Sequence, residues 1–143
     1  MNDLDEICSM AVDFRRVWES VLQSALKHQD TAGSCLYAAM LLSNSLSRFA
    51  ESATQVRGGD GRDGGLRDRY GVLRGHYWVE GCTKTGYAFV VDVTADQFGY
   101  DKVVVLPLEV ARSVYQPGDQ ATVDEHVETE RVLCESAVSS CPD

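Results

Sequence analysis

Apolar residues recur along the first part of the chain at the spacing of a helix that buries one face. Within residues 4–27 this period of about 3.6 residues is visible at Ile7, Phe14 and Val21. A second run over residues 34–51 has a broader apolar face, which is typical of a helix packed against a sheet. We therefore predict two N-terminal helices, the second of them central.

From residue 70 onward the pattern changes to short apolar runs rich in β-branched and aromatic residues. Strands are predicted over residues 54–57, 72–80, 87–94 and 103–106. Residues 108–115 fit either a helical turn or another strand, and residues 123–134 fit a polar helix. This order of elements indicates an α+β domain, with the N-terminal helices packed on a central antiparallel sheet. We expect residues 1–134 to form this single domain and residues 135–143 to form a disordered tail.

Composition narrows the classes of function. A net charge of -9 argues against nucleic-acid binding through phosphate contacts. We expect no membrane association, because no apolar run approaches the ~18 residues of a membrane span. The acidic N-terminus has no apolar signal core, which predicts a cytoplasmic protein or an effector secreted without a cleaved signal. The five cysteines are an odd number without C-x-x-C spacing, so we expect a reducing compartment and no metal site.

Three residues carry the pattern with the most chemical content. Cys35, His76 and Asp92 occur in this order within G-S-C-L-Y-A-A, G-H-Y-W-V-E and V-V-D-V-T. A thiol, an imidazole and a carboxylate suffice for nucleophilic acyl transfer, because the imidazole maintains a thiolate and the carboxylate orients the imidazole. Cys35 opens an apolar helical run, where the helix dipole favours a thiolate. Taken singly, each residue also has an ordinary structural interpretation, and their combination favours catalysis.

A hairpin explains how the imidazole and the carboxylate can meet. A three-residue loop at residues 83–85, followed by Gly86 with a positive φ, places His76 directly opposite Asp92. Opposed residues share one face of the sheet, with Cβ atoms about 5 Å apart. A slip of one residue would put the two side chains on opposite faces, so this prediction depends on the turn.

Other residues are candidates for substrate binding. The Cys35 backbone N–H lies at a helix start, where it can stabilise an oxyanion, and Gln29 can donate a second hydrogen bond. Ser34 leaves room for a substrate backbone. Trp78 fits either the core or a substrate platform. The Gly-rich residues 58–65 lack a phosphate-binding motif and fit either a mobile loop beside the site or a surface insertion.

These motifs resemble the transglutaminase-like branch of the papain-like cysteine enzymes. The family pattern is a Cys that opens a helix of small and apolar residues, then H-x-W-x-E on one strand and D-x-T on the next. The matching segments, within residues ~29–96 and with the gaps of compact bacterial members, are Gly33-Ser34-Cys35, His76-Tyr77-Trp78-Val79-Glu80 and Asp92-Val93-Thr94. The resemblance implies a helix-plus-sheet core, with Cys35 as nucleophile, His76 as base and Asp92 as the orienting residue. Gln29 resembles the oxyanion glutamine of papain-like enzymes.

We therefore expect a cysteine hydrolase that acts on a peptide or protein amide through a Cys35 thioester, either as a peptidase or as a glutamine deamidase. Two alternatives stay open at this point. One is a transglutaminase-type acyl transferase, in which an amine replaces water. The other is a catalytically silent binding module of the same fold, because the family includes inactive relatives. We expect no cofactor, and nothing in the chain matches the calcium sites of animal cross-linking enzymes.

Overall fold

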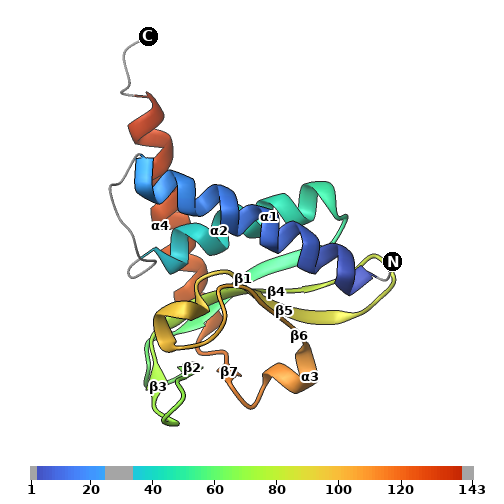
Figure 1. The fold of residues 1–143 in the computed structure, drawn as a ribbon. Coiled ribbons are helices and arrows are strands. Elements are labelled where there is room, and N and C mark those ends of the chain that lie inside the picture. The colour runs from blue at the N-terminus through green and yellow to red at the C-terminus, as the bar shows by residue number, and fades with distance from the viewer. Residues whose placement is uncertain (1–2, 25–33, 140–143) are drawn as a thin grey trace.

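The computed structural model describes residues 3–24 and 34–139 (Figure 1). The helices are α1 (Asp3–Ser24), α2 (Cys35–Phe49), α3 (Leu108–Ala111) and α4 (Gln120–Ser139), with a 3₁₀ helix η1 (Ala95–Phe98). The strands are β1 (Ala53–Gly59), β2 (Gly65–Arg67), β3 (Leu73–Arg74), β4 (His76–Cys82), β5 (Ala88–Asp92), β6 (Val104–Pro107) and β7 (Tyr115–Gln116).

Four antiparallel strands form the central sheet, in the order β1–β4–β5–β6. Helix α2 packs on β1 and β4, α1 packs on β5 and β6, and α4 runs along β1. The small sheet β3–β2–β7 and helix α3 lie on the other side of the central sheet (Figure 1). The described chain therefore combines helices with an antiparallel sheet, in agreement with the predicted α+β class.

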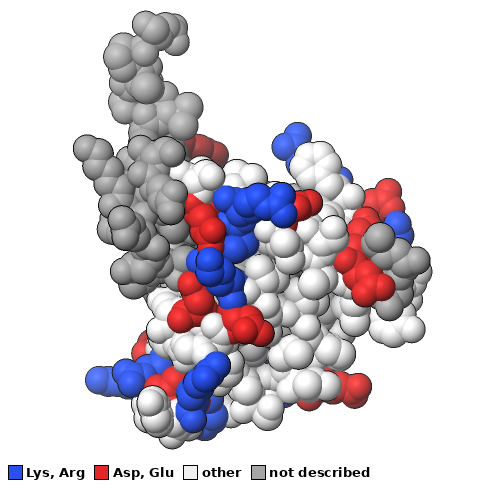
Figure 2. Space-filling view, viewed as in Figure 1, with Lys and Arg blue, Asp and Glu red and all other residues white. Residues whose placement is uncertain are grey.

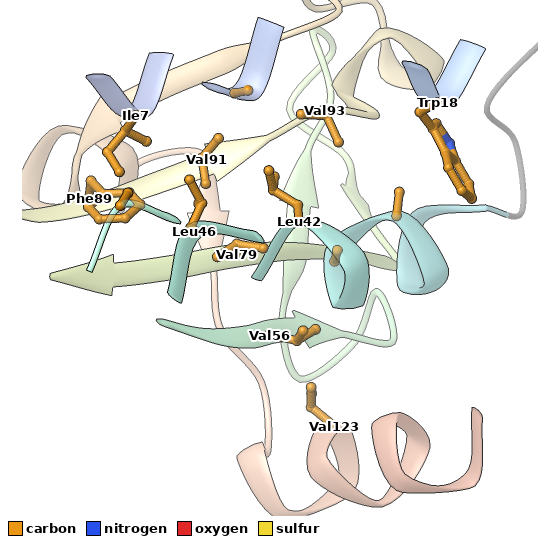
Figure 3. Packing of buried hydrophobic residues seen from close by; sticks show 14 residues of the cluster. Ile7, Trp18, Leu42, Leu46, Val56, Val79, Phe89, Val91, Val93 and Val123 are labelled. Atoms are coloured by element: carbon orange, nitrogen blue, oxygen red, sulfur yellow. The ribbon is translucent and has the colours of Figure 1, made fainter. Parts of the chain in front are cut away.

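The main core lies between the central sheet and the N-terminal helices (Figure 3). Alternate strand residues point to one face of a sheet, and on this face Val79, Phe89 and Val91 meet Ile7 of α1 and Leu42 of α2. Each of these five side chains is at most 1% exposed. Burial of each contributes about 1.5–3 kcal/mol relative to exposure, so this layer fixes α2 on the sheet.

A second core occupies the opposite face of the sheet. Its fully buried members are Leu66, Trp78, Val90, Ala111 and Tyr115. Trp78 and Val90 alternate along their strands with residues of the main core, which explains why they point the other way. In this second core, Tyr115 of β7 packs against Trp78 of β4 and Val90 of β5, the two strands that carry the candidate site.

The residue that terminates helix α2 has a left-handed backbone conformation. Glu51 has a φ of 52°, and the N–H groups of Ala50 and Ser52 both donate to the carbonyl oxygen of Leu46. This arrangement satisfies carbonyls at a helix end and normally uses glycine, which has no Cβ to clash. The apolar stretch predicted over residues 34–51 therefore stops being helical at Phe49 because the backbone reverses just after it.

The turn between β4 and β5 is longer than predicted. Cys82 pairs with Ala88, so the loop has five residues rather than three, and Thr83 N–H donates to the Tyr87 carbonyl oxygen over 2.8 Å. Gly86 does have the predicted positive φ, at 96°.

This difference moves the register of the hairpin by two residues. Val79 pairs with Val91, and continuing that register places Asp92 opposite Trp78, so the predicted direct opposition of His76 and Asp92 is wrong. A shift of two residues leaves every side chain on its original face, because the strand period is two. His76 and Asp92 therefore still share a face, as diagonal neighbours.

Several element boundaries also differ from the prediction. Helix α4 continues through Ser139, so part of the segment predicted as a disordered tail is helical. Residues 108–115 contain both predicted alternatives in succession, a short helix and the start of β7. The small sheet β3–β2–β7 was not predicted, because its strands have only two or three residues each. The last residues predicted for the first helix, 25–27, lie outside the described part of the chain.

The Gly-rich segment 58–65 makes close backbone contacts. Gly118 N–H donates to the Gly58 carbonyl oxygen over 2.8 Å. A Cβ on Gly64 would lie 2.4 Å from both the Gln116 oxygen and the Gly118 nitrogen, which no side chain tolerates. Glycine is therefore needed here so that the β1–β2 loop can touch the segment before α4.

Charges are interleaved on the surface. Among the described side chains on the face in Figure 2, basic and acidic groups lie next to one another, and no extended field of one sign is visible. Within residues 3–24 and 34–139, no helix is long and apolar enough to cross a membrane.

Candidate active site

The imidazole of His76 and the carboxylate of Asp92 form a buried pair. His76 opens β4 and Asp92 closes β5, so both lie at the same end of the central sheet. His76 Nε2 lies 2.8 Å from Asp92 Oδ2, and each residue is 1% exposed. A buried carboxylate needs partners to offset its lost hydration, and the imidazole supplies one of them.

Asp92 is held by further donors on both of its oxygens. Tyr115 Oη donates to Oδ2 over 2.9 Å. Oδ1 accepts from the Thr94 backbone N–H over 2.9 Å and from Thr94 Oγ1 over 3.3 Å. An aspartate that bonds the backbone two residues ahead is a common turn device, so the same contact that ends β5 also fixes the carboxylate.

Cys35 is the first residue of α2, as predicted, and it is a free, partly exposed thiol. Its side chain lies close enough to His76 to interact with the ring. Burial disfavours a charged imidazole, but the charge and hydrogen bond of Asp92, joined by a hydrogen bond and charge from Cys35, raise the pKa of His76 to about 9. The structure therefore brings together the three residues predicted as a catalytic triad, with His76 as an imidazolium at neutral pH.

The second nitrogen of the ring faces a different set of groups. Because Nε2 is bonded to Asp92, Nδ1 is the nitrogen left for other partners. Gln97 Nε2 lies 3.5 Å from Nδ1 and donates to the Thr94 carbonyl oxygen over 3.0 Å. The longer contact is a hydrogen bond only when Nδ1 carries no proton. The Phe98 ring stands edge-on to the imidazole, with centroids 4.9 Å apart, and shields it from water.

Helix η1, which carries Gln97 and Phe98, is anchored by a buried arginine of α1. The Arg15 guanidinium donates to both carboxylate oxygens of Asp96, over 2.8 and 3.0 Å, and to the Val93 carbonyl oxygen over 2.8 Å. Such two-pronged pairs are stronger and more directional than single contacts. The first helix therefore fixes the segment that covers His76.

Trp78 and Glu80 lie behind the site and not beside a substrate. Trp78 is 1% exposed, its ring packs edge-on against Tyr115 at 5.2 Å, and its Nε1 donates to Glu80 over 2.8 Å. Arg112 donates to both Glu80 oxygens over 2.6 and 2.7 Å. Burial alone would raise the pKa of Glu80, but hydrogen bonds from Arg112 and Trp78 hold it below its ordinary value. Trp78 is therefore part of the core, which is the first of its two predicted interpretations.

The remaining predicted site residues have different outcomes. Ser34 is the residue just before α2, and its carbonyl oxygen accepts from the Ala38 N–H over 3.0 Å. The Cys35 N–H is therefore in the first turn of the helix, as predicted. Gln29 lies outside the described residues. Tyr115 and Arg112 were not singled out from the sequence, since they fall in a segment that fitted both a helix and a strand.

Two spaces adjoin the site. A narrow gap, too small to admit a water molecule, lies at Cys35 between α2 and the ends of β4 and β5. A wider hollow of about 510 Å³ lies between η1 and the β2–β3 turn, and its lining includes Gln97, Phe98, Arg69 and Tyr70. Gln97 and Phe98 contact the buried His76 ring as well as lining this hollow, so they stand between the hollow and the imidazole.

Among the described residues, no group of three or more His, Cys, Asp or Glu side chains is arranged to hold a metal ion. Comparisons with protein families, curated proteins and solved structures found no match to this chain. Functional inference therefore depends on the geometry of Cys35, His76 and Asp92.

Proposed function

We propose that this chain is a cysteine hydrolase that cleaves a peptide or protein amide through a thioester at Cys35. One observation carries the proposal. The buried His76 imidazole is bonded through Nε2 to Asp92 at 2.8 Å and also interacts with the Cys35 side chain. A partly exposed Cys at a helix start, next to a buried His–Asp pair, is the arrangement needed for thiolate attack on a carbonyl.

In the first half of the reaction, the Cys35 thiolate attacks the carbonyl carbon and forms the C–S bond. The carbonyl oxygen takes the electron pair, and the Cys35 N–H at the start of α2 is placed to stabilise it. The C–N bond then breaks, and His76 donates its Nδ1 proton to the leaving nitrogen. The products of this half are a thioester, a free amine and a neutral imidazole.

In the second half, His76 Nδ1 takes a proton from water while the water oxygen attacks the thioester carbon. The C–S bond breaks and its electron pair returns to sulfur. A carboxylic acid leaves, and the thiolate and the imidazolium are restored. Asp92 keeps the ring orientation through both halves, because its bond to Nε2 persists while Nδ1 gains and loses the proton.

The substrate class follows from the chemistry and the space. Both a backbone amide and a glutamine side chain present the required carbonyl and a nitrogen leaving group. The hollow beside η1, at about 510 Å³, has room for a few residues of a peptide. We therefore favour a peptide or an exposed protein segment over a compact metabolite.

Intact mass measurement after incubation with an activated acyl ester tests for the nucleophile without knowledge of the substrate. We expect one acyl group on the wild-type chain, mapped to Cys35, and none at that position in Cys35→Ala. Cys82→Ala is the matched control, because Cys82 is an exposed free thiol away from His76, and it should acylate as the wild type does. Equal acylation of wild type and Cys35→Ala would refute the proposal.

A further inference from the structure

We propose that Tyr115 is a positioning residue that holds Asp92 toward His76, and that Arg112 and Glu80 hold Tyr115 in place. The inference rests on the proposed function of the Cys35 site and adds a role that the triad itself does not explain. It assigns a purpose to the buried Trp78 and Glu80, which share a face of β4 with His76 because residues two apart point the same way.

The first step is the contact between Tyr115 and Asp92. Tyr115 is 1% exposed, and its hydroxyl donates to Oδ2, the same oxygen that faces His76 Nε2. With the two contacts from Thr94 on Oδ1, each carboxylate oxygen has two partners. Loss of the Tyr115 hydroxyl would leave the Thr94 side of the carboxylate fixed and the His76 side held by the ring alone.

The second step is what holds Tyr115. Arg112 lies at the end of α3 and grips Glu80 of β4 with both terminal nitrogens. The same Nη1 lies 3.4 Å from the Tyr115 carbonyl oxygen and donates to it. Trp78 adds its ring contact with Tyr115. A planar guanidinium that bridges two elements fixes direction as well as distance, so β7 is tied to β4 next to the site.

The third step is electrostatic. The groups that face His76 are Asp92 from β5 and Cys35 from α2, and those that face Tyr115 are Asp92 and Tyr100. The hydroxyl of Tyr115 donates a hydrogen bond to Asp92 Oδ2 and so neutralises part of the negative charge on that oxygen. The attraction between the carboxylate and a protonated His76 ring is therefore weaker than it would be without Tyr115. Its removal should therefore strengthen the binding of a proton by His76.

Tyr115→Phe isolates this hydroxyl, because the ring and its packing on Trp78 remain. We would follow the ¹⁵N-labelled imidazole of His76 by NMR over pH 6–11.5, with the signal assigned by its loss in His76→Gln. Relative to wild type, the titration midpoint of His76 should rise by about one pH unit, a tenfold increase in proton affinity. A purely structural tyrosine would change the melting temperature and leave this midpoint unmoved.

Tyr100→Phe is the matched control. Its hydroxyl donates to the Arg67 carbonyl oxygen over 2.5 Å and makes no bond to Asp92, so the His76 midpoint should stay at the wild-type value. Arg112→Lys keeps the charge but not the two-pronged geometry. It should shift the midpoint in the same direction as Tyr115→Phe by a smaller amount, and it supplies the test if Tyr115→Phe does not fold.

The outcomes separate the two proposals. A folded Tyr115→Phe, or a folded Arg112→Lys where the former is unfolded, with an unchanged His76 midpoint overturns the positioning role, whatever Cys35 does with the acyl ester. A shifted midpoint in a protein whose Cys35 never acylates supports the positioning role and refutes the hydrolase. A midpoint that shifts equally in Tyr100→Phe would show a general effect of the cluster and would also overturn the inference.

Discussion

His76 and Asp92 form their 2.8 Å contact as diagonal neighbours across the β4–β5 hairpin, and not as an opposed pair. Continuing the observed pairing places Trp78 opposite Asp92. Diagonal neighbours lie farther apart than opposed ones, but long side chains still reach across. The contact therefore survives in a register two residues away from the one that the turn residues predict.

We predict that Cys35 is the most reactive of the five thiols. The His76 ring beside Cys35 can take the thiol proton as the sulfur attacks, whereas Cys8 and Cys82 are simply exposed thiols. Limiting iodoacetamide at pH 6.5 with peptide mapping measures this, and His76→Ala should slow labelling of Cys35 by about tenfold or more. Faster labelling of Cys82 than of Cys35 in folded protein would contradict the prediction.

Asp92→Asn should lose most of the acylation rate while keeping the fold. An amide at this position can donate to Nε2, which favours the wrong tautomer of His76, and we expect a loss on the order of 10² or more. Melting temperature measured beside the acylation rate separates stability from chemistry. Asp13→Asn, on the exposed surface of α1, is the control. Acylation of Asp92→Asn at the wild-type rate would make Asp92 a structural residue only.

The stability of the fold should fall as the solution becomes alkaline. The pKa of His76 is raised to about 9 in the folded chain, above the ~6.5 of an unfolded histidine. The folded state therefore binds the proton more tightly, so the stabilisation is complete below pH 6.5 and is lost as the pH rises toward 9. The loss should be about 3 kcal/mol.

Urea unfolding at pH 6, 7.5 and 9.5 measures that loss, with His76→Gln as the reference for all other titrating groups. The variant should be less stable than wild type at pH 6, and its free energy of unfolding should vary less with pH. Parallel curves for the two proteins would mean that His76 does not gain a proton on folding.

Glu51→Gly should stabilise the protein. Glu51 holds a φ of 52° at the end of α2, a conformation that costs a residue with a Cβ roughly 1–2 kcal/mol and costs glycine little. After the larger chain entropy of unfolded glycine is subtracted, the gain should be about 0.5–1 kcal/mol. Glu51→Ala is the control and should give no such gain. Destabilisation by Glu51→Gly would show that the glutamate side chain outweighs the backbone cost.

We predict hydrolysis rather than transfer as the fate of the thioester. Cys35 is partly exposed and water is present at roughly 55 M, so an amine competes with water only if the site binds and orients it. Incubation of the enzyme with casein and a labelled primary amine should give chain cleavage, or a mass gain of about one dalton at glutamine from exchange of nitrogen for oxygen. Covalent incorporation of the amine as the main product would establish the transferase alternative.

The sequence by itself determined the features that depend on local periodicity. The apolar spacing defined α1 and α2 to within a few residues, and Cys35 stands at the start of α2 as predicted. The period of two along β4 and β5 determined that His76 and Asp92 share a face, because that property survives any even shift of register. Helix periodicity and strand alternation both depend on residues close together in the sequence, so the sequence pattern alone shows them.

Only the tertiary structure decided the features that depend on distant segments. The register of the hairpin was set by a five-residue loop and by packing on both faces of the sheet, not by the turn residues alone. Tyr115 reaches Asp92 from 23 residues away, and Arg112 reaches Glu80 from 32 residues away. No local period encodes such contacts, because they arise when β7 and α3 close under the sheet and bury polar groups that must then find partners.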